Sequence, residues 1–327
     1  MNQSQFEQNH QEQWSRFQAL LGFLENKPDR AKKDVSIADL PVHYRQLCNH
    51  YSLAQARHYS PALVDRLHEL VLRGHRQLYK KKTALIWNVL AFMGRDFPQT
   101  VRRHYRAFWL AFVLFYGPAA AIGIATYRNP ALIYSIADER QVVQMETMYD
   151  PDNRKIGRAA ERDSETDLAM FGYYILNNIS IGFRTFAGGI IFGLGSIFFL
   201  VFNGVMIGGV AGHLSHPPFN STFWPFVSGH GAFELTAIVI SGAAGLLLGY
   251  SLIRPGRYKR ADALRLQAPT ALKLVMGAAA LLLFAAFIEA FWSSSPLPPA
   301  IKYGMAACNW TLVTLYLVFA GRTGNGS

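Results

Sequence analysis

The chain has 327 residues, a formal net charge of +11 and a mean hydropathy of +0.11, averages that fit a basic soluble protein. The charges are unevenly spread, because residues 1–106 hold 17 basic and 9 acidic groups, whereas residues 169–327 hold 9 basic groups and only 3 acidic ones. So long a stretch with three acids cannot form the surface of an ordinary soluble domain. The composition therefore excludes a single soluble globule, a disordered chain and a secreted disulfide scaffold.

The cysteines and the chain ends give further expectations about disulfides and about the location of the N-terminus. Cys48 and Cys308 lie in segments of very different composition and form no CxxC motif, so we expect two free thiols. Residues 1–13 are polar and lack the apolar core of a secretory signal peptide, so we expect the N-terminus to stay in the cytosol. Residues 323–327 are interpreted as a tag remnant.

A cytosolic helical bundle is predicted over residues 1–83. Apolar residues recur at steps of three and four over 12–25, over 37–59 and again from Pro61 onward, which is the periodicity of amphipathic helices. A bundle of this size buries only a modest area. We therefore expect it to pack on the membrane domain or on a partner protein.

Residues 84–106 are predicted to form an interfacial helix and a basic connector. The apolar run 84–93 is too short to cross a bilayer, and lysines at 80–82 precede it. Four arginines follow between 95 and 106. We expect these basic residues to face anionic membrane lipid, and we expect no nucleic-acid partner.

The membrane domain is predicted over residues 107–322. Residues 107–126 carry no charge and match one bilayer crossing, and the basic residues before them place the preceding segment in the cytosol. Residues 127–168 then form an outer loop with six basic and nine acidic groups.

The apolar block 168–213 is too long for one crossing. It is interpreted as two spans, 168–183 and 189–212, or as a re-entrant hairpin, because 168–183 is short and polar. Either interpretation leaves the basic loop 254–265 in the cytosol, after a span at 231–252.

Two more spans, 271–291 and 304–321, complete an all-α polytopic membrane protein. The prediction is about six crossings, or four plus a re-entrant hairpin, with both termini cytosolic in a bacterial inner membrane. The spans also contain glycines four residues apart, a spacing that allows close helix packing. We interpret this spacing as packing within the chain or, alternatively, as the interface of a homo-oligomer. The glycines are Gly189, Gly193, Gly204, Gly208, Gly212, Gly245 and Gly249.

Ionisable residues inside the spans are few, and each is a candidate for function. His230 and Glu234 lie one helical turn apart, and the predicted topology places Glu289 at a similar depth near the outer side. Three interpretations remain open: a structural hydrogen-bond network, a pathway for protons or cations, and a metal site. Other intramembrane polar candidates are Arg184, Asn177, Asn178 and Asn203.

A metal site would use imidazoles and carboxylates, and the candidate ligands are His213, His216, His230 and Glu234. Their spacing matches no zinc motif, so no cofactor is expected, although a divalent metal stays an alternative. The pair Asp150 and Asp152 lacks the spacing of an EF-hand and is interpreted as a turn. Walker, GxSxG and Rossmann motifs are absent from the sequence.

Three motifs resemble the longer, non-sporulation branch of the stage II sporulation protein M family. They are Asn203-Gly204 followed by small residues, HGAFEL at 230–235, and IEAF at 288–291. The run 67–79 of the N-terminal third is similar too. The resemblance implies an integral membrane protein of bacterial or archaeal type. Sporulation members act with partner proteins in septal peptidoglycan remodelling. The longer branch is often encoded beside a MoxR-type ATPase, which implies an assembly role.

The first functional hypothesis is a non-enzymatic scaffold for envelope-associated partners. Its basic helical domain would bind a cytosolic protein, with a MoxR-type ATPase system as a candidate, and its outer loop would bind an envelope protein. The alternative is a transporter or channel that uses His230, Glu234 and Glu289. A third hypothesis is an intramembrane metal-dependent enzyme.

Overall fold

The computed structural model describes residues 2–26, 40–152 and 164–322, with the side chains of 79–85 and 164–169 left aside. Residues 323–327, interpreted above as a tag remnant, lie outside the described residues. Every regular element in the described part is helical, as predicted. Both cysteines are free. The chain divides into two compact units, residues 1–91 and residues 92–327.

Unit 1 consists of α1 (Gln3–Asn26), α2 (Leu40–Ala56) and α3 (Pro61–Ala91). Each helix turns its apolar stripe inward, because one stripe of an amphipathic helix must be buried. The shared core includes Trp14, Leu47 and Leu67, which are at most 2% exposed. This unit therefore has a hydrophobic core of its own.

Two boundaries in unit 1 differ from the prediction. α1 begins at residue 3, so the glutamine-rich start is helical rather than irregular. α3 continues to Ala91, so residues 84–91 do not begin a separate helix as predicted, and their location at the membrane interface stays a prediction. Neither proline nor glycine occurs between Gly74 and residue 91 to stop the helix. The unit boundary accordingly falls at residue 91 instead of 83.

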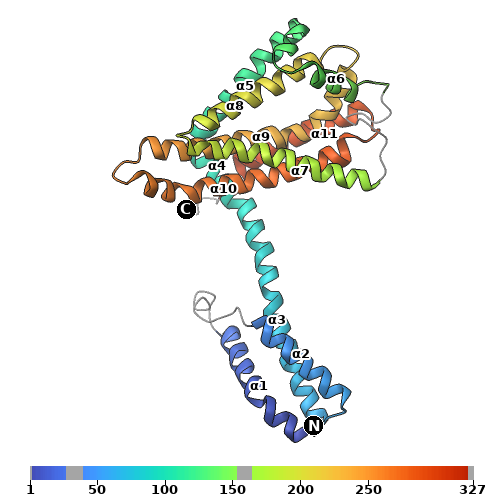
Figure 1. The fold of residues 1–327 in the computed structure, drawn as a ribbon, viewed down its shortest axis with the longest axis vertical. Coiled ribbons are helices and arrows are strands. Elements are labelled where there is room, and N and C mark those ends of the chain that lie inside the picture. Colours follow the sequence, from blue (N-terminus) through green and yellow to red (C-terminus); the bar gives the residue numbers. More distant parts are fainter. Residues whose placement is uncertain (1, 27–39, 153–163, 323–327) are drawn as a thin grey trace. The chain divides into compact units, whose positions relative to one another are not determined.

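Unit 2 is built from twelve described elements, six of them helices of 20 residues or more (Figure 1). In chain order they are η3 (Phe92–Asp96), α4 (Phe97–Arg103), α5 (Tyr105–Arg128), η4 (Pro130–Ser135), α6 (Glu139–Met148), α7 (Ser164–Ala187), η5 (Gly188–Ile190), α8 (Leu194–His213), α9 (Asn220–Ile253), α10 (Arg260–Phe287) with its continuation η6 (Ile288–Ser293), and α11 (Pro299–Phe319). The η3 and η6 segments are π-helical.

Four helices in the described part of the chain are long and apolar enough to cross a membrane: α5, α8, α9, and α10 together with η6. Their outward faces carry large exposed apolar side chains such as Val113, Phe198 and Phe287, which is expected for contact with lipid. The chain is thus an all-α membrane protein. α7 and α11 are not among the four, although 24 and 21 residues span about 36 and 32 Å as helices. The number of crossings stays a prediction.

The pair α5 and α8 packs at backbone distance because of glycine. A Cβ atom at Gly204 would collide with the carbonyl of Phe115, one at Gly208 with Ala119, and one at Gly212 with Gly123. Along this contact the residue numbers of α5 and of α8 increase in the same direction, so the two helices run parallel. In Figure 1 they run together at a steep angle to α9 and α10.

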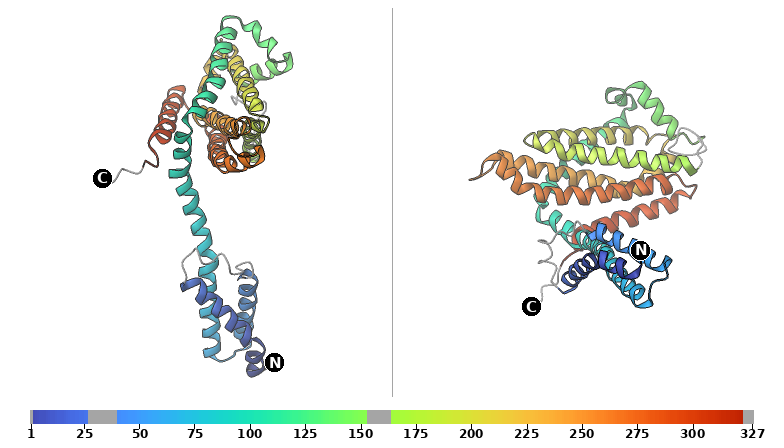
Figure 2. Two further views of the ribbon diagram at one scale, coloured as in Figure 1. Left: turned by 90° about the vertical axis from the view of Figure 1, so that its left-hand side faces the viewer. Right: turned by 60° about the horizontal axis from the view of Figure 1, so that its bottom comes forward.

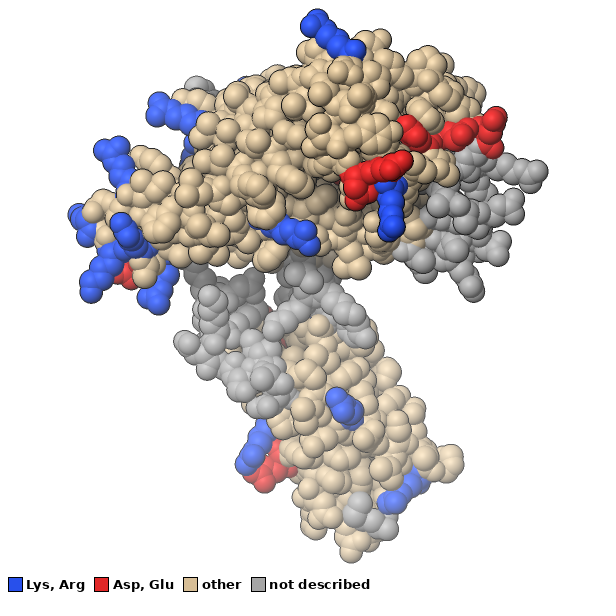
Figure 3. All heavy atoms as spheres, turned by 45° about the horizontal axis from the view of Figure 1, so that its top comes forward, with Lys and Arg blue, Asp and Glu red and all other residues tan. Residues whose placement is uncertain are grey.

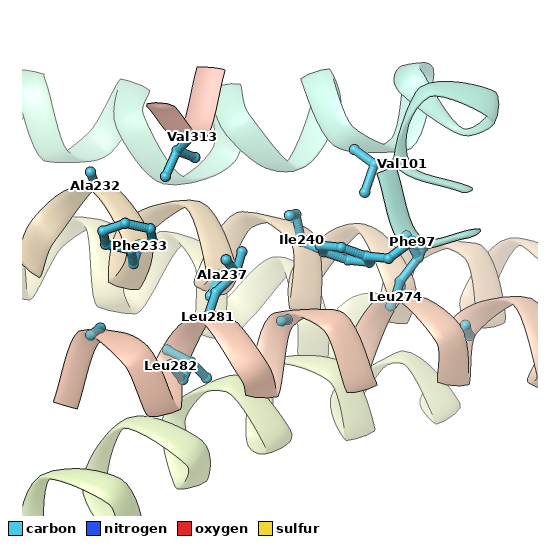
Figure 4. Packing of buried hydrophobic residues seen from close by; sticks show 14 of the residues in the cluster. Phe97, Val101, Ala232, Phe233, Ala237, Ile240, Leu274, Leu281, Leu282 and Val313 are labelled. Carbon is cyan, nitrogen blue, oxygen red and sulfur yellow. The ribbon is translucent and has the colours of Figure 1, made fainter. Parts of the chain in front are cut away.

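A second group of helices, α7, α9, α10 and α11, lies side by side (Figures 1 and 2). Gly189 of η5 lies against Gly245 of α9, and Gly193 lies against Gly249. Gly182 of α7 lies against Ser241 of α9, four residues before Gly245, so α7 runs parallel to α9. The main apolar core lies between α9 and α10 and includes Phe233, Ile240 and Leu274, with Phe97 of α4 packed against it (Figure 4).

Two spans are longer than predicted, and both changes affect the loops. α9 begins at Asn220 rather than 231, with Pro225 inside its first turns. α10 begins at Arg260, so the predicted basic loop 254–265 shrinks to residues 254–259. Lysine and arginine side chains still gather at this end of unit 2, and acidic side chains gather over α6 (Figure 3). The charge separation that was predicted to orient the protein is therefore present.

Candidate functional site

A polar cluster lies where the first half of α9 meets the end of α10. His230 and Glu234 project from the same face of α9, and Nε2 of His230 lies 3.7 Å from Oε2 of Glu234. Glu289 lies in the π-helical turn η6 that continues α10. The three potential ligand atoms all lie within 4.8 Å of one another. Tertiary structure thus brings together the three residues that the predicted topology placed at one depth.

Hydrogen bonds from neighbouring helices hold two of these side chains. Nδ1 of His230 lies 3.0 Å from Oγ of Ser293, so Nε2 faces Glu234. Asn178 of α7, which is 2% exposed, donates through Nδ2 to Oε2 of Glu289 at 3.4 Å. If the Ser293 hydroxyl donates to Nδ1, neutral His230 carries its proton on Nε2. If Nδ1 donates to the hydroxyl oxygen, the proton is on Nδ1. The cluster therefore joins α7, α9 and the end of α10.

Tyr149, from the segment between α6 and α7, packs over the start of α9. Its ring contacts those of Phe223 and Phe226 edge-on, with centroids 5.1 and 5.6 Å apart. Its backbone carbonyl accepts a hydrogen bond from the hydroxyl of Thr222. The ring of Phe226 in turn packs edge-on against the imidazole of His230, with the ring centroids 5.8 Å apart. An aromatic stack therefore connects the segment before α7 with the polar cluster.

The electrostatic surroundings of Tyr149 also place it beside the cluster. Burial raises the pKa of the Tyr149 hydroxyl, and the nearby Glu289, Tyr174 and Glu234 raise it further. A negative charge on the phenol would be unfavourable near two carboxyl groups and far from water. Tyr149 is therefore a neutral hydroxyl at neutral pH and can donate a hydrogen bond.

Two further buried polar residues come from α11. Nζ of Lys302, whose residue is 3% exposed, donates to the backbone carbonyl of Ser293 at 2.8 Å. Nδ2 of Asn309 donates to the backbone carbonyl of Gly229 at 2.7 Å. The first bond ends on Ser293, the hydrogen-bond partner of His230, and the second ends on Gly229, the residue before His230. They tie α11 to the same end of α9 and η6.

The remaining predicted polar residues lie apart from His230. His213 bonds Oε1 of Glu146 at 2.8 Å, and His216 bonds the carbonyl of Tyr127 at 2.8 Å. The candidate metal set of His213, His216, His230 and Glu234 is therefore divided between separate places. Asn203 donates to Phe199 of its own helix at 2.7 Å.

The last two polar candidates lie at or near the surface of α7. Asn177 is exposed, although its Nδ2 atom lies 3.4 Å from the side-chain oxygen of Asn178. Arg184 is exposed in the last turn of the helix. Of the predicted asparagines, only Asn178 reaches the cluster directly.

Sequence reasoning missed four residues around the cluster: Tyr149, Ser293, Lys302 and Asn309. Lys302 and Asn309 could have been found, because each is a polar group within or next to an apolar run. Nothing in the sequence marks Tyr149 or Ser293. Their roles depend on a chain segment and a π-helical turn whose positions only folding decides.

Comparison with known proteins gives two family matches over different parts of the chain. Residues 110–294 match the model for Stage II sporulation protein M, and residues 4–80 match a domain of unknown function (DUF8413). An uncharacterized protein of Methanocaldococcus jannaschii is 32% identical over 124 residues, which is 37% of this chain and 69% of the relative. No solved structure matches. Because the first match covers more than half of the chain, the protein belongs to the stage II sporulation protein M family.

Proposed function

We propose that the protein is a non-enzymatic membrane scaffold or assembly protein for cell-envelope partners. The observation that carries this proposal is that buried polar groups of unit 2 bond from one helix to another. Asn178 bonds Glu289, Lys302 bonds the carbonyl of Ser293, and Asn309 bonds that of Gly229. Such bonds hold helices in a fixed arrangement, which suits a platform that presents binding surfaces.

Unit 1 is the proposed docking element for a cytosolic protein. It has its own core and matches its own domain model, so it is a module separate from the spans. A MoxR-type ATPase is the first candidate partner, because such ATPases are often encoded beside longer members of the family. The segment with η4 and α6 is the proposed contact for an envelope protein on the other side.

The proposed location is a bacterial inner membrane with both termini cytosolic. Basic residues gather near the start of α5 and around the α9–α10 turn, whereas acidic ones gather over α6. A groove of about 600 Å³ lies between the start of α5 and the end of α9. Arg103 and Arg106 line it together with Leu110, Leu246 and Tyr250. Cationic and apolar walls together suit the head group and upper acyl chain of an anionic lipid.

The scaffold proposal is tested with the purified full-length protein in proteoliposomes. We expect it to form a stable complex with a purified MoxR-type ATPase, and to move no ions and turn over no substrate alone. Catalysis or solute movement by the protein alone would contradict the proposal. A variant with the exposed Arg45 and Arg57 of unit 1 changed to glutamate should bind the ATPase less tightly.

An ion-coupled transporter is the second candidate, because three ionisable groups lie within 4.8 Å of one another inside a membrane protein. Under this alternative, a pH gradient across proteoliposomes would drive a flux that Glu234→Gln and Glu289→Gln abolish. Asp262→Asn, at the start of α10, is the matched control. A membrane enzyme that depends on metal is the third candidate. Metal analysis of protein purified without added metal distinguishes this enzyme from the other two candidates.

A homo-oligomer also stays a proposal. The glycines whose spacing suggested an interface make close contacts inside the chain, so an oligomer would have to use other faces. Chemical cross-linking of the detergent-solubilised full chain, followed by mass measurement, tests this: a ladder at multiples of 36.6 kDa supports an oligomer and a single species opposes it.

A further inference from the structure

We propose that His230, Glu234 and Glu289 bind one divalent transition-metal cation, with Zn²⁺ as the reference ion. The site joins two elements, since His230 and Glu234 belong to α9 whereas Glu289 belongs to η6. The bound cation would therefore link α9 with the end of α10. This inference does not rest on the scaffold proposal.

The ligand atoms are close enough for a single ion. Zn²⁺ binds imidazole nitrogen and carboxylate oxygen at about 2.0–2.2 Å, so two ligands of one tetrahedral ion lie roughly 3.5 Å apart. The His230–Glu234 distance is already 3.7 Å, and all three atoms lie within 4.8 Å. Glutamate side chains have several rotatable bonds, and small torsional changes suffice to close the remaining gap.

The types of ligand indicate which ion is suitable. One imidazole and two carboxylates suit zinc, manganese or ferrous iron, and three protein ligands leave a coordination position for water. Calcium and magnesium prefer oxygen ligands alone. The imidazole in the cluster therefore favours a transition metal.

Two ligands have the supporting contacts that metal ligands usually have. Nδ1 of His230 is held by Ser293 at 3.0 Å, which directs Nε2 toward the two carboxylates. Asn178 donates to Oε2 of Glu289 at 3.4 Å, so the other oxygen of that carboxylate is left for an ion. Partners outside the ligand set orient ligands in this way in established metal sites.

The charge of the cluster favours a cation as well. In the described part of the chain, neither Glu234 nor Glu289 lies within ion-pair distance of a lysine or arginine. Lys302 donates to a backbone carbonyl instead of a carboxylate. Two nearby carboxylates in a mostly buried site repel each other strongly, and a divalent cation between them removes that repulsion.

The test uses full-length protein in detergent, treated with a chelator and titrated with Zn²⁺ by calorimetry. We expect one ion per chain and a higher Tm with zinc bound. Glu234→Gln and Glu289→Gln should each weaken binding by at least about tenfold, because each removes a ligand that the site needs. His216→Gln is the matched control, since that imidazole bonds Tyr127 elsewhere, and it should bind zinc as the wild type does.

X-ray absorption of the zinc-loaded wild-type protein decides the ligand set without any variant. We expect one imidazole, oxygen for the remaining ligands and no sulfur. Zinc bound with equal affinity by the glutamine variants would overturn the proposal, as would a sulfur ligand or the absence of stoichiometric binding. If a glutamine variant does not fold, the absorption spectrum gives the answer. A metal-free wild type would still leave the scaffold proposal intact.

Discussion

Gly208 of α8 lies against the backbone of Ala119 in α5, so closely that a Cβ atom at 208 would overlap the carbonyl of Ala119. The contact repeats one turn away in each direction, at Gly204 and Gly212. α5 and α8 are thus held together mainly by close backbone packing. This contact identifies α5 as the helix against which the regularly spaced glycines of α8 pack.

Gly208→Ala should therefore destabilise the protein. Alanine gains up to about 1 kcal/mol of helix propensity over glycine, but forcing the helices apart costs about 1–3 kcal/mol or more. The net effect should be a lower Tm in detergent. Gly117→Ala, in the same helix pair, is the control, because nothing lies within 4 Å of the added Cβ. Equal Tm values for the two variants would contradict the packing that we describe.

Unit 1 should lose stability as the pH falls. Trp14 donates through Nε1 to Nδ1 of His50 at 3.2 Å, a bond that needs a neutral imidazole. Burial, and then the neighbouring His10, lower the pKa of His50 from 6.5. The unfolded chain therefore takes up a proton more readily. This stabilisation is fully present above about pH 6.5 and is lost as the pH falls toward the lowered folded pKa.

Hydrogen exchange of peptides from α2, corrected for intrinsic exchange rates, measures this effect in the full chain. Protection should be lower at about pH 5.5 than at about pH 7.5, because His50 titrates in that interval. His50→Gln, whose amide oxygen can still accept the tryptophan bond, should flatten the pH dependence. A pH dependence that persists in this variant would assign the effect to another group.

Tyr149→Ala should loosen the outer end of α9. The substitution removes edge contacts with Phe223 and Phe226 and leaves a cavity beside Phe226, whose ring packs on His230. Tyr149 is half-buried, so we expect a cost below the about 3–5 kcal/mol of a fully buried aromatic ring. The unfolding transition in detergent should shift accordingly, whereas Tyr134→Ala should change it little because Tyr134 is 55% exposed. Similar shifts for both variants would show that Tyr149 is not packed on α9.

Arg103→Gln with Arg106→Gln should reduce the retention of anionic lipid. Both side chains line the groove between α5 and α9, and each basic residue near a membrane surface contributes about 1 kcal/mol. Native mass spectrometry of protein in mixed phosphatidylglycerol and phosphatidylcholine should show fewer bound phosphatidylglycerol molecules for the double variant. Arg128→Gln, at the other end of α5, is the control and should retain the wild-type number.

The helices of this protein could be predicted because each is encoded locally. The apolar run 107–126 predicts α5, and the stripe that begins at Pro61 predicts α3. Boundaries were less predictable, since α9 begins at Asn220 although Pro225 and polar residues follow. Pro225 is the sixth residue of α9 and removes one helical hydrogen bond, so the sequence disfavours a helix there, whereas packing of Tyr149 on Phe223 and Phe226 stabilises these turns.

The polar cluster was only partly predictable, because local sequence encodes positions within one helix but not contacts between helices. The spacing of His230 and Glu234 places them on one helix face, and the topology places Glu289 at a similar depth. The partners Ser293, Asn178 and Tyr149 come from three other places in the chain. Which residues meet across helices depends on rotation and crossing angle, and hydropathy carries no information about either.

The sequence by itself determined that this is an all-α membrane protein, because uncharged apolar runs and few acids are dictated by the bilayer as solvent. Residue identities alone also drew attention to His230, Glu234 and Glu289. Only the tertiary structure decided that these three meet within 4.8 Å, while His213 and His216 bond elsewhere. The π-helical turn positions Glu289, and close glycine packing holds α8 against α5 and η5 against α9. Both features depend on neighbouring helices.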